Sequence, residues 1–216
     1  MSVRHVQTTV RGRYLVEPGP NGTGALFVGF HGYGETAERH LERLQRLPGA
    51  ERATLVSVQS LHLFYTKAGE VVGSWMTKLD REHAIADNVA YVGAVVAEVK
   101  RVHPSLGRPV YFGFSQGASM AYRAAAHAGH PCAGVFVLGG DMPPDVADDP
   151  AATLPPVLAA RGARDEWFTD AKLERDVERL RERGVSVRSV VFDGGHEWPE
   201  PLFAAASEYL DALEVA

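Results

Sequence analysis

The sequence predicts an α/β protein in which helices cover both faces of a mostly parallel sheet of about seven to eight strands. Two observations carry this prediction. From residue 25 onward, short apolar runs alternate with longer stretches in which apolar residues recur at helical spacing. The apolar runs are continuous, as in Ala-Leu-Phe-Val-Gly-Phe at 25–30, which is typical of strands buried on both faces.

We expect eight segments to form strands. Each is short and rich in apolar or β-branched residues, and a turn or loop follows it. Arg11 and Gly12 separate the first two segments, where a tight turn is expected. In chain order the expected strands are residues 3–10, 13–16, 25–30, 54–58, 110–114, 133–138, 157–160 and 185–192.

Five segments have helical character. The longest carries one apolar stripe, formed by Ile85, Val89, Val92, Val96 and Val99, and Asp80 could cap its start. A helix is also predicted directly after Ser115, and another ends before Gly184. The expected helices are residues 36–47, 80–102, 116–128, 169–183 and 199–213.

Three segments are predicted as loops. Residues 18–24 are rich in Gly, Pro and Asn, and residues 143–155 in Pro and Asp. Residues 59–77 are expected to be irregular, with aromatic residues set among glycines. Because no internal repeat or linker interrupts the pattern, we expect residues 1–216 to form one domain.

Composition excludes several classes of function. The net charge is −5 with the two signs well mixed, so we expect no nucleic-acid partner. No apolar run approaches the roughly 18 residues of a membrane span, and the N-terminal segment has no apolar signal core. The single cysteine, Cys132, favours a buried structural thiol and a reducing, cytoplasmic location. No GxGxxG or HExxH motif occurs, so neither a cofactor nor a metal is expected.

Residues 113–117, Gly-Phe-Ser-Gln-Gly, lie where a predicted strand turns into a predicted helix. A Gly-x-Ser-x-Gly pentapeptide alone is weak evidence, because a serine in a tight turn would also fit it. In the strand–turn–helix context it predicts a nucleophile elbow, in which the corner raises the hydroxyl of Ser115 at a helix N-terminus.

A serine nucleophile needs a histidine base, which in this chain order should follow it. Three histidines do. His127 and His130 close the helix after the elbow, where they would satisfy terminal carbonyls. His196 directly follows the last predicted strand, at the sheet edge where ligands bind in open α/β sheets. We therefore favour His196 as the base.

The carboxylate that orients the histidine has several candidates. Asp165 follows the strand before the histidine strand, which suits the third member of a triad, and we prefer it. Asp141, Asp193 and Glu166 remain open, although Asp193 would have to fold back on its own loop.

A tetrahedral intermediate needs two donors for its oxyanion. The backbone N–H of Gln116, directly after the nucleophile, is one candidate. His-Gly-Tyr-Gly-Glu at 31–35 follows an earlier strand, and its glycines allow the N–H of Tyr33 to turn inward. We expect His31 to be a structural hydrogen-bonding residue rather than a base.

These motifs resemble those of a known family. HGYGE, GFSQGAS, GARDEWF and GGHEWP, in this order, are similar to segments of the phospholipase/carboxylesterase family of α/β-hydrolases, which includes acyl-protein thioesterases and small bacterial carboxylesterases. The resemblance covers roughly residues 25–213. It implies Ser115, Asp165 and His196 as the catalytic triad, and the main-chain N–H groups of Tyr33 and Gln116 as the oxyanion hole. It departs from the family at Ala118, where a second glycine is common.

The chain is too short for a large lid. Aromatic residues near the expected site could therefore line a shallow acyl or alcohol pocket, with core packing as the alternative for each. The candidates are Trp75, Trp167, Phe168 and Trp198, of which Phe168 and Trp198 are preferred because they neighbour triad residues.

The leading hypothesis is a serine carboxylesterase that hydrolyses small or medium acyl esters or thioesters through an acyl-enzyme. The alternatives are acyl-protein thioesterase or lysophospholipase activity, peptidase or acyltransferase activity on the same triad, and a non-catalytic ligand-binding protein. The expected partner is a small-molecule ester. An exposed apolar surface could support a homodimer, which the sequence does not locate.

Overall fold

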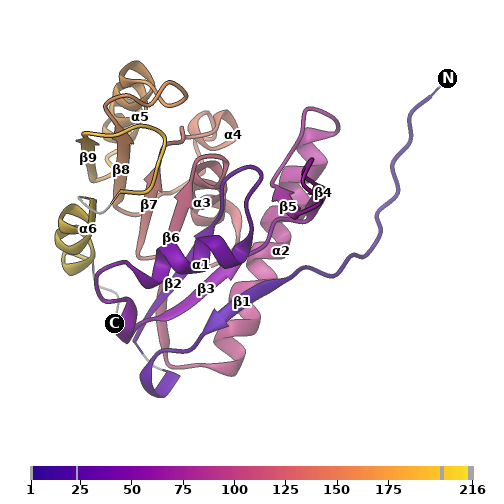
Figure 1. Cartoon of the computed structure of the whole chain (residues 1–216), viewed down its shortest axis with the longest axis horizontal. Coiled ribbons are helices and arrows are strands. Elements are labelled where there is room, and N and C mark those ends of the chain that lie inside the picture. The colour runs from indigo at the N-terminus through magenta and orange to yellow at the C-terminus, as the bar shows by residue number, and fades with distance from the viewer. Residues whose placement is uncertain (1, 23, 200–201, 214–216) are drawn as a thin grey trace.

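The computed structural model describes residues 2–22, 24–199 and 202–213. Within them, seven strands form a central sheet (Figure 1). Only β1 runs antiparallel to its neighbour, which confirms the predicted, mostly parallel sheet. The order across the sheet is β1 (Tyr14–Glu17), β3 (Thr54–Val58), β2 (Gly24–Phe30), β6 (Leu106–Phe114), β7 (Gly134–Leu138), β8 (Val157–Gly162) and β9 (Val187–Phe192).

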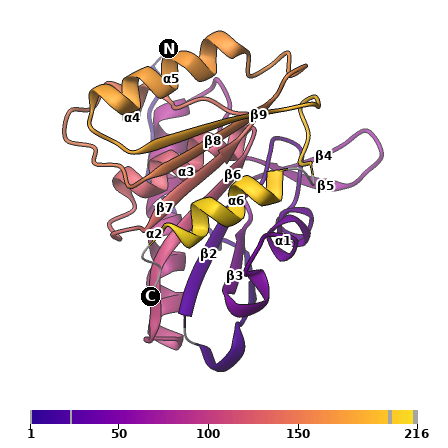
Figure 2. The same ribbon diagram turned by 90° about the vertical axis from the view of Figure 1, so that its left-hand side faces the viewer.

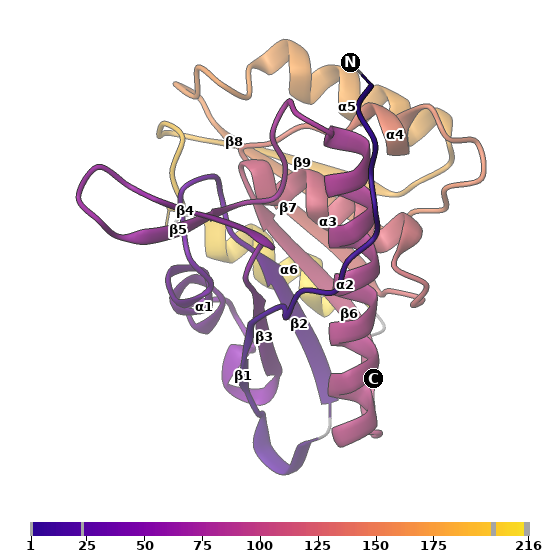
Figure 3. The same cartoon turned by 90° about the vertical axis from the view of Figure 1, so that its right-hand side faces the viewer.

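Helices cover both faces of this sheet, as predicted. Helices α1 (Ala37–Gln45) and α6 (Leu202–Asp211) lie on one face (Figure 2). The other face carries α2 (Arg81–Val102), α3 (Gln116–His127) and α5 (Asp170–Glu182), and Figure 3 shows α2 in front of the sheet. A one-turn helix, α4 (Pro144–Ala147), interrupts the predicted loop at 143–155.

Strand β2 shows why the apolar runs are continuous. Leu26, Val28 and Phe30 pack into the core on the side of α2 and α3, whereas Phe27 packs on the side of α1. Alternate side chains of a strand point to opposite faces, so a strand covered on both sides needs apolar residues at every position. Fully burying one such phenylalanine contributes about 1.5–3 kcal/mol.

The prediction of a strand at residues 3–10 is wrong. This segment forms no strand, and Val3, Val6 and Val10 are 75%, 89% and 63% exposed. It runs outside the sheet alongside α2, because β1 at residue 14 is already the edge strand (Figure 3). Arg11 and Gly12 form no turn.

The prediction of a cap at Asp80 is also wrong. Asp80 precedes α2 with φ 47°, and its side chain makes no capping hydrogen bond. Its Oδ1 instead lies 3.1 Å from Nε2 of His5 in the N-terminal segment. The apolar stripe of α2 is confirmed in its second half, where Val92, Val96 and Val99 are buried, whereas Ile85 and Val89 are only half-buried.

Residues 59–77 are more ordered than the sequence suggested. They contain a two-stranded antiparallel hairpin, β4 (His62–Tyr65) and β5 (Val71–Ser74), which projects from the main sheet (Figure 3). Asn88, buried within the stripe of α2, donates to the carbonyl of Trp75 at 2.9 Å and ties the end of the hairpin to the helix. Pattern alone missed the hairpin because β4 is largely exposed and lacks the apolar run of the central strands.

The remaining boundaries shift by a few residues. β6 begins at Leu106 rather than at residue 110, and β8 extends to Gly162. Part of the helix predicted at 199–213 lies outside the described residues; its described part is α6. Throughout the described segments, no helix is both long enough and apolar enough to cross a lipid bilayer.

Candidate active site

Ser115 lies on a sharp corner between β6 and α3. Its backbone has φ 54° and ψ −119°, and residues with a side chain rarely adopt positive φ. The flanking glycines make the corner possible. A methyl group added at Gly113 would lie 2.3 Å from the carbonyl oxygen of Gly117, and one added at Gly117 would lie 2.1 Å from that of Phe30. The corner therefore has the geometry of a nucleophile elbow.

His196 and Asp165 form a hydrogen-bonded pair beyond the carboxyl ends of β9 and β8. Nδ1 of His196 lies 2.8 Å from Oδ2 of Asp165, whose side chain is 1% exposed. The other carboxylate oxygen accepts the N–H groups of Trp167 and Phe168, each at 2.9 Å. Because the carboxylate accepts a hydrogen bond from Nδ1–H, the ring proton stays on Nδ1 and the lone pair on Nε2 can act as a base.

The other carboxylate candidates lie elsewhere. Asp193 is 89% exposed and pairs with Arg164. Asp141 faces cationic side chains of α5, and Glu166 is exposed. The turn after β8 directs the Asp165 carboxylate inward, and the structure thereby selects Asp165 from the four candidates as the partner of His196.

Two consecutive glycines after β7 pack closely against His196 and Ser115. A methyl group added at Gly139 would lie 2.9 Å from Cε1 of His196, and one added at Gly140 would lie 2.3 Å from the carbonyl oxygen of Ser115. The N–H of Ser115 also donates to the carbonyl of Leu138 at 2.8 Å. The end of β7 thus contacts both the elbow and the imidazole.

The loop at residues 31–35 follows β2 and packs beside the elbow. Gly34 donates to the carbonyl of Gly73 in β5, and Gly73 donates back to Glu35, both at 2.9 Å. Among the described residues, the N–H of Tyr33 finds no acceptor within the chain, in contrast to its neighbours. Gln116 is the first residue of α3, so its N–H has no intrahelical acceptor. Both amides expected to bind an oxyanion are therefore available.

A sequence model of the phospholipase/carboxylesterase family matches residues 15–213. The chain belongs to this family. Solved structures with a similar fold include esterase PE8, with 21% identity, a TM-score of 0.76 and coverage of 96% of this chain and 100% of that chain. The Bacillus cereus carboxylesterase has 16% identity, a TM-score of 0.75 and 93% coverage of both chains. Zea mays acyl-protein thioesterase 2 has 19% identity, a TM-score of 0.74 and coverage of 94% of this chain and 99% of that chain.

At these identities the structural likeness is one of fold, and it confirms the predicted α/β-hydrolase fold. No curated protein sequence matches the chain significantly. The resemblance to the phospholipase/carboxylesterase family that the motifs indicated is also confirmed.

His31 is a structural hydrogen-bonding residue in this member of the phospholipase/carboxylesterase family, as predicted. Its ring is fully buried, and Nε2 accepts the N–H of Ser60 at 3.1 Å. The ring proton must then lie on Nδ1, which donates to the carbonyl of Gly32 at 2.7 Å. Burial lowers the pKa of His31, so the ring stays neutral and braces the loop.

We predict that the protein loses stability in mild acid, because two of its histidines are buried. Burial lowers the pKa of both His31 and His40 below the ordinary value of 6.5, and for His40 the charge of Arg43 adds to this effect. Below about pH 6.5 the unfolded chain therefore binds more protons than the folded chain. The free energy of unfolding should fall by up to about 1.4 kcal/mol per pH unit for each histidine as pH decreases toward 5.

Urea unfolding between pH 7 and pH 5 at constant ionic strength measures this loss. The variant His40→Leu should show a shallower dependence, because one titrating group is gone. Equal stability at pH 7 and pH 5 would contradict the prediction.

The side chain of Gln116 has a role that sequence reasoning missed. Its Oε1 accepts the N–H of Trp75 at 2.8 Å, and its Nε2 donates to the carbonyl of Met76 at 3.2 Å. These bonds tie the segment after β5 to the elbow. The contact joins residues about 40 positions apart, so no local pattern could reveal it.

The structure divides the predicted pocket aromatics. Trp75 is 0% exposed and donates through Nε1 to the carbonyl of His31 at 2.8 Å, and Phe168 is 2% exposed. Both are core residues in this structure, which corrects the pocket role expected for them. Trp198 is half-buried and lines a cavity together with His196. Trp167 is 75% exposed.

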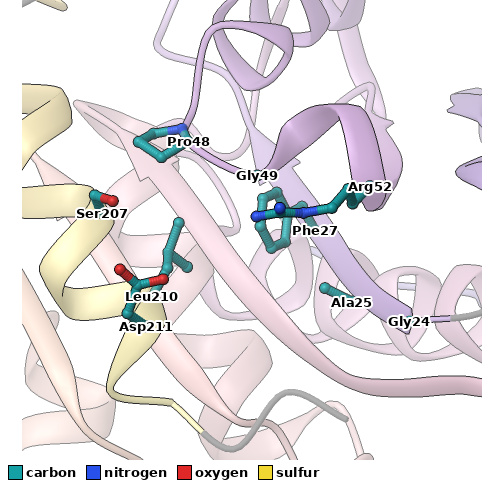
Figure 4. Close-up of a pocket in the computed structure, with 9 residues that line it drawn as sticks. All are labelled: Gly24, Ala25, Phe27, Pro48, Gly49, Arg52, Ser207, Leu210 and Asp211. Atoms are coloured by element: carbon teal, nitrogen blue, oxygen red, sulfur yellow. The ribbon is translucent and has the colours of Figure 1, made fainter.

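The cavity beside His196 has a volume of about 390 Å³. It is lined by Glu35, Arg39, Glu42, Arg43, Arg46, Phe114, His196, Glu197 and Trp198. A second cavity, of about 310 Å³, lies at the amino end of β2 between Arg52 and Asp211 (Figure 4). Since Ser115 follows the carboxyl end of the parallel neighbour β6, this second cavity is at the opposite end of the sheet from the elbow.

Proposed function

We propose that this protein is a serine hydrolase that cleaves carboxylic ester or thioester bonds of small to medium acyl substrates through an acyl-enzyme on Ser115. The observation that carries the proposal is the Asp165–His196 pair, at 2.8 Å, beside a serine on a positive-φ elbow. The family to which the chain belongs supports it.

In the first half-reaction, Oγ of Ser115 attacks the carbonyl carbon as Nε2 of His196 takes the hydroxyl proton. The N–H groups of Tyr33 and Gln116 stabilise the oxyanion of the tetrahedral intermediate. When the bond to the alcohol or thiol breaks, His196 returns the proton to the leaving group. A water molecule, deprotonated by the same imidazole, then attacks the acyl-enzyme and releases the acid.

Asp165 holds the imidazole in the tautomer that this sequence of steps requires. Its Oδ1 accepts hydrogen bonds from two backbone N–H groups, so Oδ2 is the oxygen that accepts the hydrogen bond from Nδ1–H of His196. The carboxylate also stabilises the imidazolium that forms transiently.

Asp165→Asn should lower kcat by about 10³ to 10⁴ without unfolding the protein. The amide oxygen would keep the hydrogen bonds from the N–H groups of Trp167 and Phe168. The NH₂ group would then face His196. Nδ1 would then have to accept a hydrogen bond from this NH₂. The ring proton would therefore lie on Nε2, which could not serve as the base.

The test combines p-nitrophenyl ester hydrolysis with labelling of Ser115 by a fluorophosphonate. Asp193→Asn is the matched control, because it makes the same chemical change on an exposed residue, and it should keep wild-type kcat. A panel of esters and thioesters of increasing acyl length then defines the preferred bond. Wild-type protein that neither hydrolyses the panel nor becomes labelled would refute the proposed function.

A further inference from the structure

A buried ion pair braces the loop at residues 31–35. The carboxylate of Glu35 accepts the N–H of Gly32 at 2.8 Å and pairs with Nη1 and Nη2 of Arg43 at 2.6 and 2.8 Å. The two side chains are only 10% and 12% exposed. Two parallel bonds between a guanidinium and a carboxylate fix their relative orientation as well as their distance.

The same guanidinium also packs against the ring of Phe114, which contacts His196. The central carbon of Arg43 lies 4.4 Å from the centre of the Phe114 ring, a cation–π arrangement. The Phe114 ring in turn lies 5.0 Å from the ring of His196. One side chain of α1 therefore contacts both the loop that carries Tyr33 and the aromatic ring against which the imidazole packs.

The electrostatics favour a charged and permanent pair. Burial opposes ionisation of Glu35, but the hydrogen bond and charge of Arg43, together with the Gly32 N–H, outweigh burial and lower the pKa of this carboxyl. Although Arg43 lines the cavity beside His196, its terminal nitrogens are bonded to Glu35 and its face is covered by Phe114. These contacts suit a structural brace better than a receptor for an anionic substrate.

We propose that Arg43 is a positioning residue, which aims the N–H of Tyr33 through Glu35 and holds the ring of His196 through Phe114. The inference rests on the proposed function, since it assigns Arg43 to the same reaction. Both targets act on the transition state, so loss of the brace should lower kcat more than it changes KM.

The experiment compares Arg43→Met, Arg43→Lys and Arg43→Ala with wild type in p-nitrophenyl ester hydrolysis. Arg43→Met should lower kcat by about 10- to 100-fold with KM changed less than about threefold, because a small misplacement of an oxyanion donor costs this much. Arg43→Lys should recover part of the loss, since an ammonium keeps the charge but not the two parallel bonds. Added guanidinium ion, at concentrations that do not unfold the protein, should raise the kcat of Arg43→Ala.

Arg101→Met is the matched control. Arg101 makes a two-bond pair with Glu98, at 2.8 and 2.9 Å, on the exposed surface of α2, so its loss should leave kcat unchanged. If Arg43→Met fails to fold, Glu35→Gln tests the same brace, since the amide keeps an acceptor for Gly32 but loses the charge.

The outcomes separate the two proposals. Wild-type labelling at Ser115 is measured first, and its absence would refute the proposed function and this inference together. Labelled wild type with unchanged kcat in folded Arg43→Met would overturn only the role of Arg43. A loss of kcat that follows the folded fraction alone, with no rescue by guanidinium, would also overturn it.

Discussion

Replacing Ser115 by alanine is expected to lower kcat for ester hydrolysis by about 10⁴ to 10⁶, because the acyl-enzyme can no longer form. The Asp165–His196 pair and the amides of Tyr33 and Gln116 remain in place, so substrate binding should persist. Steady-state kinetics and fluorophosphonate labelling measure the effect. Ser119→Ala, one turn further along α3, is the control and should retain wild-type activity.

The elbow also predicts a difference in stability between two inactive variants. Ser115 adopts φ 54°, which costs a residue with a Cβ about 1–3 kcal/mol, whereas glycine tolerates this conformation. Ser115→Gly should therefore be more stable than Ser115→Ala by a similar amount in urea unfolding. Substantial hydrolysis by Ser115→Ala would show that Ser115 is not the nucleophile. Equal stability of Ser115→Gly and Ser115→Ala would argue against backbone strain at the corner.

Gly117→Ala is expected to destabilise the fold by about 3 kcal/mol or more, or to prevent folding. The added methyl group would lie 2.1 Å from the carbonyl oxygen of Phe30 and 2.6 Å from that of His31. Both are backbone atoms at and directly after the end of β2, which cannot rotate away. Helix propensity alone would favour alanine over glycine by about 1 kcal/mol at this position. A loss of stability would therefore come from the steric clash rather than from helix propensity.

Gly195→Ala is the matched control for this prediction. Gly195 precedes His196, does not have positive φ, and an added methyl group would meet no heavy atom within 4 Å. Its variant should unfold at nearly the wild-type urea concentration. Wild-type stability of Gly117→Ala would show that α3 packs less closely against β2 than the structure indicates.

The elements of the sheet could be predicted because their signals are local. A strand covered on both faces needs an apolar residue at every position, so β2 is recognisable from 25–30 alone. The elbow could also be predicted locally, since Gly113 and Gly117 flank the serine between a predicted strand and a predicted helix. The hairpin β4–β5 was missed because it packs outside the main sheet and does not need such a run.

The chain order of motifs by itself predicted that Ser115 and His196 would lie at the same edge of the sheet, since both follow strands whose carboxyl ends share that edge. Tertiary structure decided which carboxylate reaches the imidazole, because the loop after β8 directs Asp165 inward whereas Asp193, directly after β9, is exposed and pairs with Arg164. It also placed Trp75 in the core and brought Arg43 against Glu35 and Phe114. Side-chain partners of this kind depend on the packing of whole elements, for which residues near in sequence carry no signal.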